Sequence, residues 1–435
     1  MAEKSQKIGL IPATSLVIGN MIGVGIFAIP AVLSKYGSIS ILGWVFSAIG
    51  ALIMAKVFSN FSKIMVNKSG GPYAFSRAGF GDFVGFLMAW GYWICVWVGN
   101  GAIVIALLGA LSYFFPVLDT NPMYQITVGL SFIWLFTWIN SRGIKESGRV
   151  QVVTTALKLV PLLFVTIVGI FFFKLDNFPE FNLTGENDFL TFPAVAVATL
   201  YAFLGIESAC IPAEDVKDPE VTVPRATMIG TIITTIVYVL STIVLFGIIP
   251  NDMLQGSLKP YAEAAQFIAG DIGGYFVAVG VVISGIGVLN GWILISGQVP
   301  MATAKDGLFP GIFKLENKKG APTIGLIIGS LLTSLMLLLS YGGGLVDQFQ
   351  FIAEISVFAA LVPYLFTAAA YILINIEKKL HTNSWVKTFM LGTLGFAYSL
   401  WAIWGSGEKT VFYGFMLLLS GLPFYLLMQW NKREK

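Results

Sequence analysis

The residues best suited to chemistry lie where two apolar segments are interrupted by glycine. The first interruption occupies residues 19–27 and the second occupies residues 203–208. Backbone that leaves the helical path at bilayer depth frees N–H and C=O groups that lipid cannot satisfy. A half-helix that starts at such a break presents N–H groups with partial positive charge, which suit a carboxylate. Paired breaks therefore predict the binding site of a transporter, although glycines also permit tight helix packing.

The composition indicates the solvent that surrounds these segments. Of the 435 residues, 56% are hydrophobic and 11% are charged, which leaves too little polar surface for a soluble globule. We therefore expect an all-α membrane protein with a single domain, residues 1–435. Recurring apolar stretches of about 20 residues predict about twelve membrane spans. They lie near residues 9–34, 40–66, 82–115, 123–140, 151–173, 190–211, 226–248, 273–303, 322–341, 350–375, 385–405 and 409–430.

The cations are distributed unevenly between the predicted connections. With the N-terminus inside, the cytoplasmic segments hold about 20 of the 26 Lys and Arg residues. The outer connections hold only Lys35, Lys174, Lys259 and Lys409. This asymmetry predicts a multi-pass protein of the plasma (inner) membrane with both termini in the cytoplasm. Residues 1–7 are interpreted as a retained tail, because no small-residue cleavage site follows them.

The sequence does not favour an enzyme. Residues 285–291 superficially match a dinucleotide-binding loop, but they lie in an apolar stretch, have the wrong last spacing and follow no strand. No Walker loop occurs, and no filter-like segment indicates a channel. His381 is the only histidine, and Cys95 and Cys210 are both intramembrane, so we expect neither a metal site nor a disulfide. We also expect no cofactor and no nucleic-acid partner.

Several motifs follow one another along nearly the whole chain. They occupy residues 7–12, 19–27, 70–74, 92–100, 205–209, 306–310 and 361–364. In this order they resemble the amino acid-polyamine-organocation superfamily, and within it the basic amino acid/polyamine antiporters of the arginine/agmatine type. The resemblance implies a LeuT-type fold built from a five-plus-five inverted repeat. Its repeats would be residues 1–173 and 190–375, followed by two accessory helices within residues 385–430.

The same resemblance implies a substrate site between spans 1, 3, 6, 8 and 10. Asn20, Gly23 and Gly25 would flank the α-carboxylate of the substrate. The unwound backbone around Tyr201 and Leu204 would receive its α-amino group. These roles agree with the chemistry of the two breaks, since one presents amide N–H groups and the other presents free carbonyl groups.

A distal guanidinium would contact Asn100, Trp292 and Ser356, with Trp292 stacked on it. A guanidinium over a tryptophan face is a favourable cation–π pair, and the pair is stronger when it is desolvated. Tyr92 and Cys95 of the third span complete the predicted site. The alternative is structural: Trp292 would be a packing aromatic, and the two polar residues would bond a neighbouring helix.

Two positions depart from the family pattern. The antiporters usually carry a tryptophan at the position of Tyr201, where it closes over the bound substrate. Arginine exchangers carry a serine that touches the carboxylate at the position of Val24. We expect Tyr201 and Tyr92 to take part in gating, and we expect Val24 to contribute only backbone groups.

Two buried charges are predicted to control transport, because ionisable residues within a membrane are functional candidates. Glu207 follows the second break and is interpreted as a proton-sensitive latch or, alternatively, as a structural carboxylate that binds freed N–H groups. Lys158 of the fifth span would stand where sodium-coupled relatives of this fold bind a cation, tethering span 5 to span 1. The alternative is a lysine that extends to the cytoplasmic surface.

These observations predict a secondary transporter that works by alternating access. The favoured function is exchange of an arginine-like cationic amino acid for its amine product or another amino acid. One alternative is proton symport of neutral or diverse amino acids with the help of Lys158. Another is a sensor that binds an amino acid without moving it. The expected partners are a small amino acid or amine, membrane lipid and a second copy in a homodimer.

Overall fold

The computed structural model describes residues 8–65, 71–142, 148–208, 210, 216–340, 344–377 and 385–433, which form helices and connections without a strand. His381 lies outside these residues. The helices of the first half are α1 Leu10–Met21, α2 Gly25–Ser34, α3 Ile39–Ile64, α4 Pro72–Leu111, α5 Val117–Thr120, α6 Pro122–Ser141, α7 Gly148–Gly169 and α8 Asp188–Leu200. Those of the second half are α9 Pro219–Ile248, α10 Asn251–Gln255, α11 Pro260–Lys305, α12 Thr323–Leu339, α13 Leu345–Glu377, α14 Trp385–Gly405, α15 Gly407–Leu419 and α16 Leu422–Arg433. Short 3₁₀ helices are η1 Ile170–Phe172, η2 Leu175–Asn177, η3 Tyr201–Phe203 and η5 Gly311–Lys314.

The long helices account for the predicted membrane spans. Within the described residues, nine helices are long and apolar enough to cross a bilayer, and the pair α1 and α2, bent by 41°, forms a tenth span. Two shorter apolar helices, residues 188–203 and 323–339, occupy the positions of the two remaining predicted spans. The fold class of an all-α membrane protein is therefore confirmed.

Several helices begin earlier than hydropathy predicts, because proline occupies their first turn. Pro72, Pro219 and Pro260 start α4, α9 and α11, where the predicted spans start near residues 82, 226 and 273. Proline suits the first helical position, since its missing N–H has no partner there in any helix. Gly81 and Gly270, with φ of 80° and 63°, then bend α4 and α11 close to the predicted starts.

Both predicted interruptions are present. The first span leaves the helical path between Met21 and Gly25, and the sixth passes from α8 through η3 into a turn around Gly205. Gly205 adopts φ of 103°, and a Cβ there would lie 3.2 Å from the carbonyl carbon of Asn20. The two breaks therefore touch through their backbones at a position that only glycine suits.

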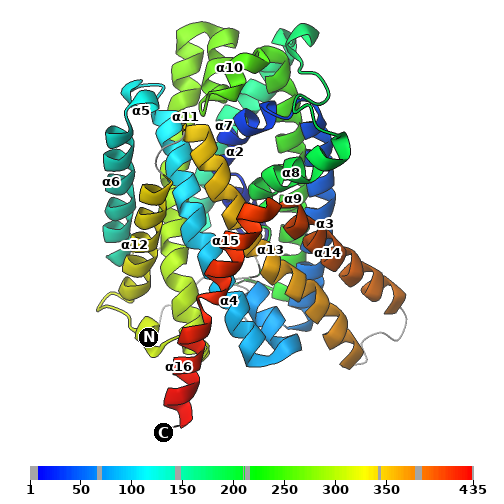
Figure 1. The fold of residues 1–435 in the computed structure, drawn as a ribbon, viewed down its shortest axis with the longest axis vertical. Helices are drawn as coiled ribbons and strands as arrows, with labels where there is room; N and C mark the ends of the chain where they lie inside the picture. Colours follow the sequence, from blue (N-terminus) through cyan, green and yellow to red (C-terminus); the bar gives the residue numbers. More distant parts are fainter. Residues whose placement is uncertain are drawn as a thin grey trace.

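The breaks lie beside two long helices at the centre of the bundle. Figure 1 shows α4 running through the middle, with α12 and α15 on either side of it. We call the end that carries α5 and α10 the upper face, and the end at which α16 finishes the lower face (Figure 1). On this basis α1, α2 and α4 run upward, whereas α8, α11 and α13 run downward. The division into repeats at residues 1–173 and 190–375 stays a prediction.

Candidate functional site

A small cavity of about 40 Å³ lies at the two helix breaks. Its walls come from α1, α2, α4, α11, α13 and the turn at η3, that is, from spans 1, 3, 6, 8 and 10. The lining residues are Asn20, Met21, Gly23, Gly25, Ile26, Cys95, Gly99, Ile103, Tyr201, Ala202, Leu204, Val288, Trp292 and Ser356. None of them is acidic, so the cavity itself holds no carboxylate to neutralise a cation.

Eight residues predicted from the sequence meet in this cavity. They are Asn20, Gly23, Gly25, Cys95, Tyr201, Leu204, Trp292 and Ser356. Two of them are joined directly, because Ser356 Oγ donates to the carbonyl of Cys95 at 2.9 Å. The amide-rich start of α2 faces the same space, and no side chain caps it. The cavity thus combines a helix N-terminus with an aromatic face, which is what an amino acid with a distal cation requires.

Three other predicted residues are not among those that line the cavity. Val24 packs toward Gly285 of α11. Tyr92 is buried and its hydroxyl is engaged by Glu207. Asn100 Nδ2 lies 3.5 Å from the carbonyl of Trp292, and its Oδ1 is buried without a partner in the described part of the chain.

The sequence analysis missed several lining residues, although periodicity contained the signal. Cys95, Gly99 and Ile103 follow one another at intervals of four and so share one face of α4. Val288 and Trp292 are related in the same way on α11. A residue already placed in the site on a helix therefore indicates its neighbours one turn away.

Carbonyl groups freed at both breaks share one donor on α9. Tyr238 Oη lies 2.7 Å from the carbonyl of Met21 and 3.1 Å from that of Ala202. The side chain is fully buried. A hydroxyl has one hydrogen, so it donates to one carbonyl at a time and can alternate between the two.

An aromatic ring covers the cavity toward the upper face. The ring of Tyr201 packs on Gly25, where a Cβ would approach it to 2.5 Å. Its hydroxyl is 3.4 Å from the carbonyl of Gly99, and Phe349 of α13 contacts it edge-on at 5.5 Å between centroids. This arrangement joins α2, η3, α4 and α13 above the cavity.

A carboxylate lies below the cavity. Glu207 is 1% exposed and accepts hydrogen bonds from Tyr92 of α4 at 2.7 Å and from Tyr364 of α13 at 2.5 Å. Tyr364 belongs to a motif noted in the sequence, but its partner became visible only in the fold. The network ties span 6 to spans 3 and 10.

Lys158 joins α7 to the first break. Its Nζ donates to the carbonyl of Gly19 at 3.1 Å, and the residue is 7% exposed. One turn earlier, Thr155 Oγ1 donates to the carbonyl of Ser15 at 3.0 Å. In the described part of the chain these two bonds connect span 5 to α1, one from a neutral hydroxyl and one from an ionisable amine.

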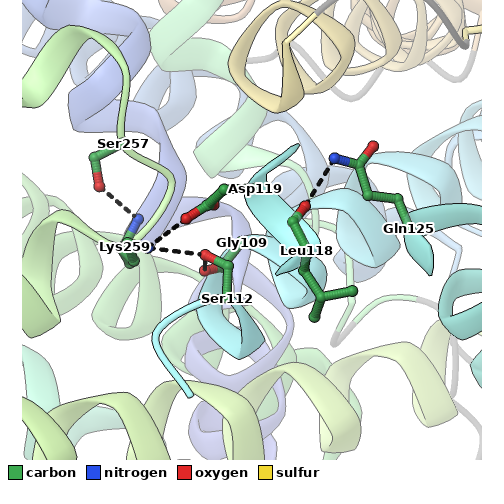
Figure 2. A network of polar contacts seen from close by, with 7 residues as sticks. All are labelled: Gly109, Ser112, Leu118, Asp119, Gln125, Ser257 and Lys259. Atoms are coloured by element: carbon green, nitrogen blue, oxygen red, sulfur yellow. Dashed lines mark hydrogen bonds and ion pairs between the residues drawn. The ribbon is translucent and has the colours of Figure 1, made fainter. Parts of the chain in front are cut away.

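A polar network holds the turn before α11 against the upper ends of α4 and α5. Figure 2 shows Lys259 between Asp119 and Ser112, at 2.6 Å and 3.2 Å from their side-chain oxygens. Two residues further on, Tyr261 donates to Ser241 of α9 at 2.9 Å. Tyr261 also contacts Phe27 of α2 edge-on. The turn thus connects the first and seventh spans to the third.

The fold and the cavity define a membrane transport protein for small solutes. The chain belongs to the amino acid permease family, whose sequence profile matches residues 8–425. This membership confirms the family indicated by the motifs, and it identifies a transporter and not an enzyme.

Named relatives are similar over nearly their whole length. An arginine/agmatine antiporter of Chlamydia felis is 33% identical over 444 residues, which covers 98% of this chain and 90% of the relative. A putative arginine/ornithine antiporter of Bacillus subtilis is 32% identical over 468 residues, covering 100% and 99%. The putrescine transporter PotE of Haemophilus influenzae is 31% identical over 431 residues, covering 98% of each chain.

Proposed function

We propose that this protein is an antiporter that exchanges a cationic amino acid, arginine-like in its distal group, for the corresponding amine or for another amino acid. The observation that carries the proposal is the cavity in which the start of α2 and the face of Trp292 lie together. The names of the relatives support the substrate class. Arginine and ornithine carry a cationic group at the end opposite their carboxylate, and agmatine and putrescine keep a cationic group without a carboxylate.

In this proposal each wall of the cavity binds one part of the substrate. The amide groups near Gly23 and Gly25 attract the α-carboxylate through the helix dipole. The carbonyl groups of the unwound segment near Tyr201 and Leu204 accept from the α-amino group. Trp292 stacks on the distal cation, an interaction of about 2 kcal/mol when desolvated.

Transport then requires the two closures to open in turn. Tyr201 closes the cavity toward the upper face, and the network at Glu207 closes it toward the lower face. The breaks act as hinges for the bundle of spans 1, 2, 6 and 7. We assign the upper face to the outside of the plasma (inner) membrane and both termini to the cytoplasm, because the positive residues concentrate on the lower connections.

Purified protein in liposomes tests the exchange. Vesicles are loaded with arginine, agmatine, putrescine or buffer alone, and uptake of labelled arginine is followed at two pH values. We expect uptake only into vesicles loaded with a substrate. Uptake into empty vesicles driven by a pH gradient would support proton symport instead, and binding without uptake would support a sensor.

A pair of glycine variants links the activity to the cavity. Gly25→Ala places a methyl group against the Tyr201 ring, whereas Gly291→Ala on α11 meets no atom within 4 Å. We expect Gly25→Ala to abolish binding of labelled arginine and Gly291→Ala to retain it. Equal binding by both variants would remove the first break from the substrate site.

Proton symport is the second candidate function, and one contact favours it. Lys158 places a titratable amine on the carbonyl of Gly19, directly beside the first break. A change in the charge of that amine would alter the bond that ties span 5 to the hinge.

The predicted homodimer is tested with the same purified protein, by measuring its oligomeric state.

A further inference from the structure

A second, larger cavity lies on the outside of the bundle, away from the substrate site. It is a groove of about 600 Å³ between α4, α12, α15 and the connection at η5. Its residues are Trp90, Trp93, Ile94, Trp97, Pro310, Ile312, Phe313, Ile328, Leu332, Leu335, Met336, Leu339, Leu417, Ser420 and Phe424. Figure 1 shows the two outer walls, α12 and α15, flanking α4.

The groove presents apolar surface even where its residues carry polar atoms. The indole N–H of Trp90 donates to the carbonyl of Leu417, and that of Trp93 donates to the carbonyl of Ser296. The hydroxyl of Ser420 is likewise used by Leu417. The indole N–H of Trp97 has no partner among the described residues, but it is buried, so these side chains offer an occupant aromatic and aliphatic contacts.

The dimensions of the groove match one half of a bilayer. Its wall on α12 runs from Ile328 to Leu339, about 16 Å at the helical rise per residue. The hydrocarbon of one leaflet is about 15 Å thick. An extended acyl chain therefore fits along this wall, whereas a soluble ligand would find no hydrogen-bonding partner.

One end of the groove is positively charged. η5 supplies Ile312 and Phe313 to the lower end of the groove, and the exposed residues Lys314, Lys318 and Lys319 follow in the next segment of the chain. The carboxylate among them, Glu316, is paired with Lys305. Lysines close to a membrane surface attract anionic head groups. A phospholipid with its chain in the groove would place its head group among these lysines.

We infer that this groove binds an anionic phospholipid as a specific ligand, held by an acyl chain against α4 and α12 and by a head group at the three lysines. The lipid packs on the outer side of α4, whose other side supplies Cys95 and Gly99 to the substrate cavity. Its occupancy therefore supports the helix on which the substrate site is built. This inference does not depend on which substrate is transported.

Native mass spectrometry of the full-length protein tests the inference, with phosphatidylglycerol and phosphatidylcholine as probes. We compare Leu335→Trp, which fills the groove, with Ile327→Trp, which lies on the same helix but on a face turned away from the groove. Both side chains are exposed, at 52% and 41%, so each variant changes the lipid-facing surface. We expect Leu335→Trp to weaken phosphatidylglycerol binding by about tenfold and Ile327→Trp to leave it unchanged.

The head group is tested separately by neutralising the lysines. Replacing Lys314, Lys318 and Lys319 one at a time with glutamine should weaken phosphatidylglycerol binding by about fivefold each and leave phosphatidylcholine unaffected. Equal binding of both lipids by the native protein would overturn the anionic assignment. A native protein whose groove is covered by a second copy, seen as a dimer that Leu335→Trp dissociates, would overturn the lipid assignment altogether.

Discussion

The hydroxyl of Tyr238 lies 2.7 Å from the carbonyl of Met21, the last residue before the first helix break. The same hydroxyl is 3.1 Å from the carbonyl of Ala202 beside the second break. Lipid cannot satisfy carbonyl groups at this depth, so a single side chain of span 7 stabilises both hinges.

Removal of this donor should therefore affect stability and transport together. Tyr238→Phe removes this donor from the buried carbonyl of Ala202, whereas the carbonyl of Met21 still accepts from the Gly23 N–H. We expect a cost of about 1–3 kcal/mol, a lower melting temperature and slower exchange. Tyr261→Phe is the control, because it removes a buried hydroxyl that bonds Ser241 and neither break. If both variants slow exchange equally, Tyr238 has no special relation to the hinges.

The two bonds between α7 and α1 allow a structural role to be distinguished from a role in pH sensing, because one comes from the ionisable amine of Lys158 and the other from the neutral hydroxyl of Thr155. Lys158→Met removes the ammonium group, and Thr155→Val removes the neutral bond one turn away. We expect both variants to slow labelled arginine uptake, but only Lys158→Met to change its dependence on pH. The measurement is initial uptake between pH 5 and pH 8, a range in which a perturbed amine can titrate. An unchanged pH profile in Lys158→Met would leave the lysine a structural tether.

Glu207 offers a second test of pH sensing. Glu207→Gln keeps one acceptor oxygen for a tyrosine hydroxyl, presents an amide donor to the other tyrosine, and cannot change its charge. If Glu207 is the proton-sensitive latch, the variant should transport with a flat pH profile. Tyr36→Phe is a suitable control, because burial raises the pKa of Tyr36 to about 12, so this phenol stays neutral throughout the range tested. A normal pH response in Glu207→Gln would contradict the latch.

The network around Lys259 predicts how readily the upper face opens. Tyr261 contacts α2 and α9, and two residues before it Lys259 is paired with Asp119 of α5 (Figure 2), so in the proposed opening this pair must separate. Lys259→Gln should therefore accelerate labelling of Cys95 by a polar thiol reagent added at the upper face, by about two- to fivefold for a partly exposed ion pair. The background is Cys210→Ser, which leaves Cys95 as the only cysteine.

The control for this experiment is Lys409→Gln, which removes a cation from the same face without touching the network. Added salt should also accelerate labelling of the native protein, because it screens the exposed part of the pair. Equal rates in Lys259→Gln and the native protein would show that the network does not limit opening.

Local features of the chain were sufficient for the fold class and for much of the cavity. A membrane span needs a run of apolar residues long enough to cross the bilayer, and a helix break needs glycine. Both features depend on residues that are consecutive in the chain, so both can be predicted from the sequence. The positions of Asn20 and Gly25 followed from the first break, and that of Trp292 followed from the resemblance to the antiporters. Helix starts were less well predicted, since proline and not hydropathy determines where α4 and α9 begin.

The partners of these residues were decided only by the tertiary structure. Tyr364 is 157 positions from Glu207, and Tyr238 is 217 from Met21. No local pattern records such pairs, because they form when separate helices pack. The sequence by itself therefore determined which backbone N–H and C=O groups would lack hydrogen bonds in a membrane. The packing of the helices decided which side chains supply those bonds. The physical reason is that helix formation depends on neighbours in the chain, whereas a buried polar group must find its partner in space.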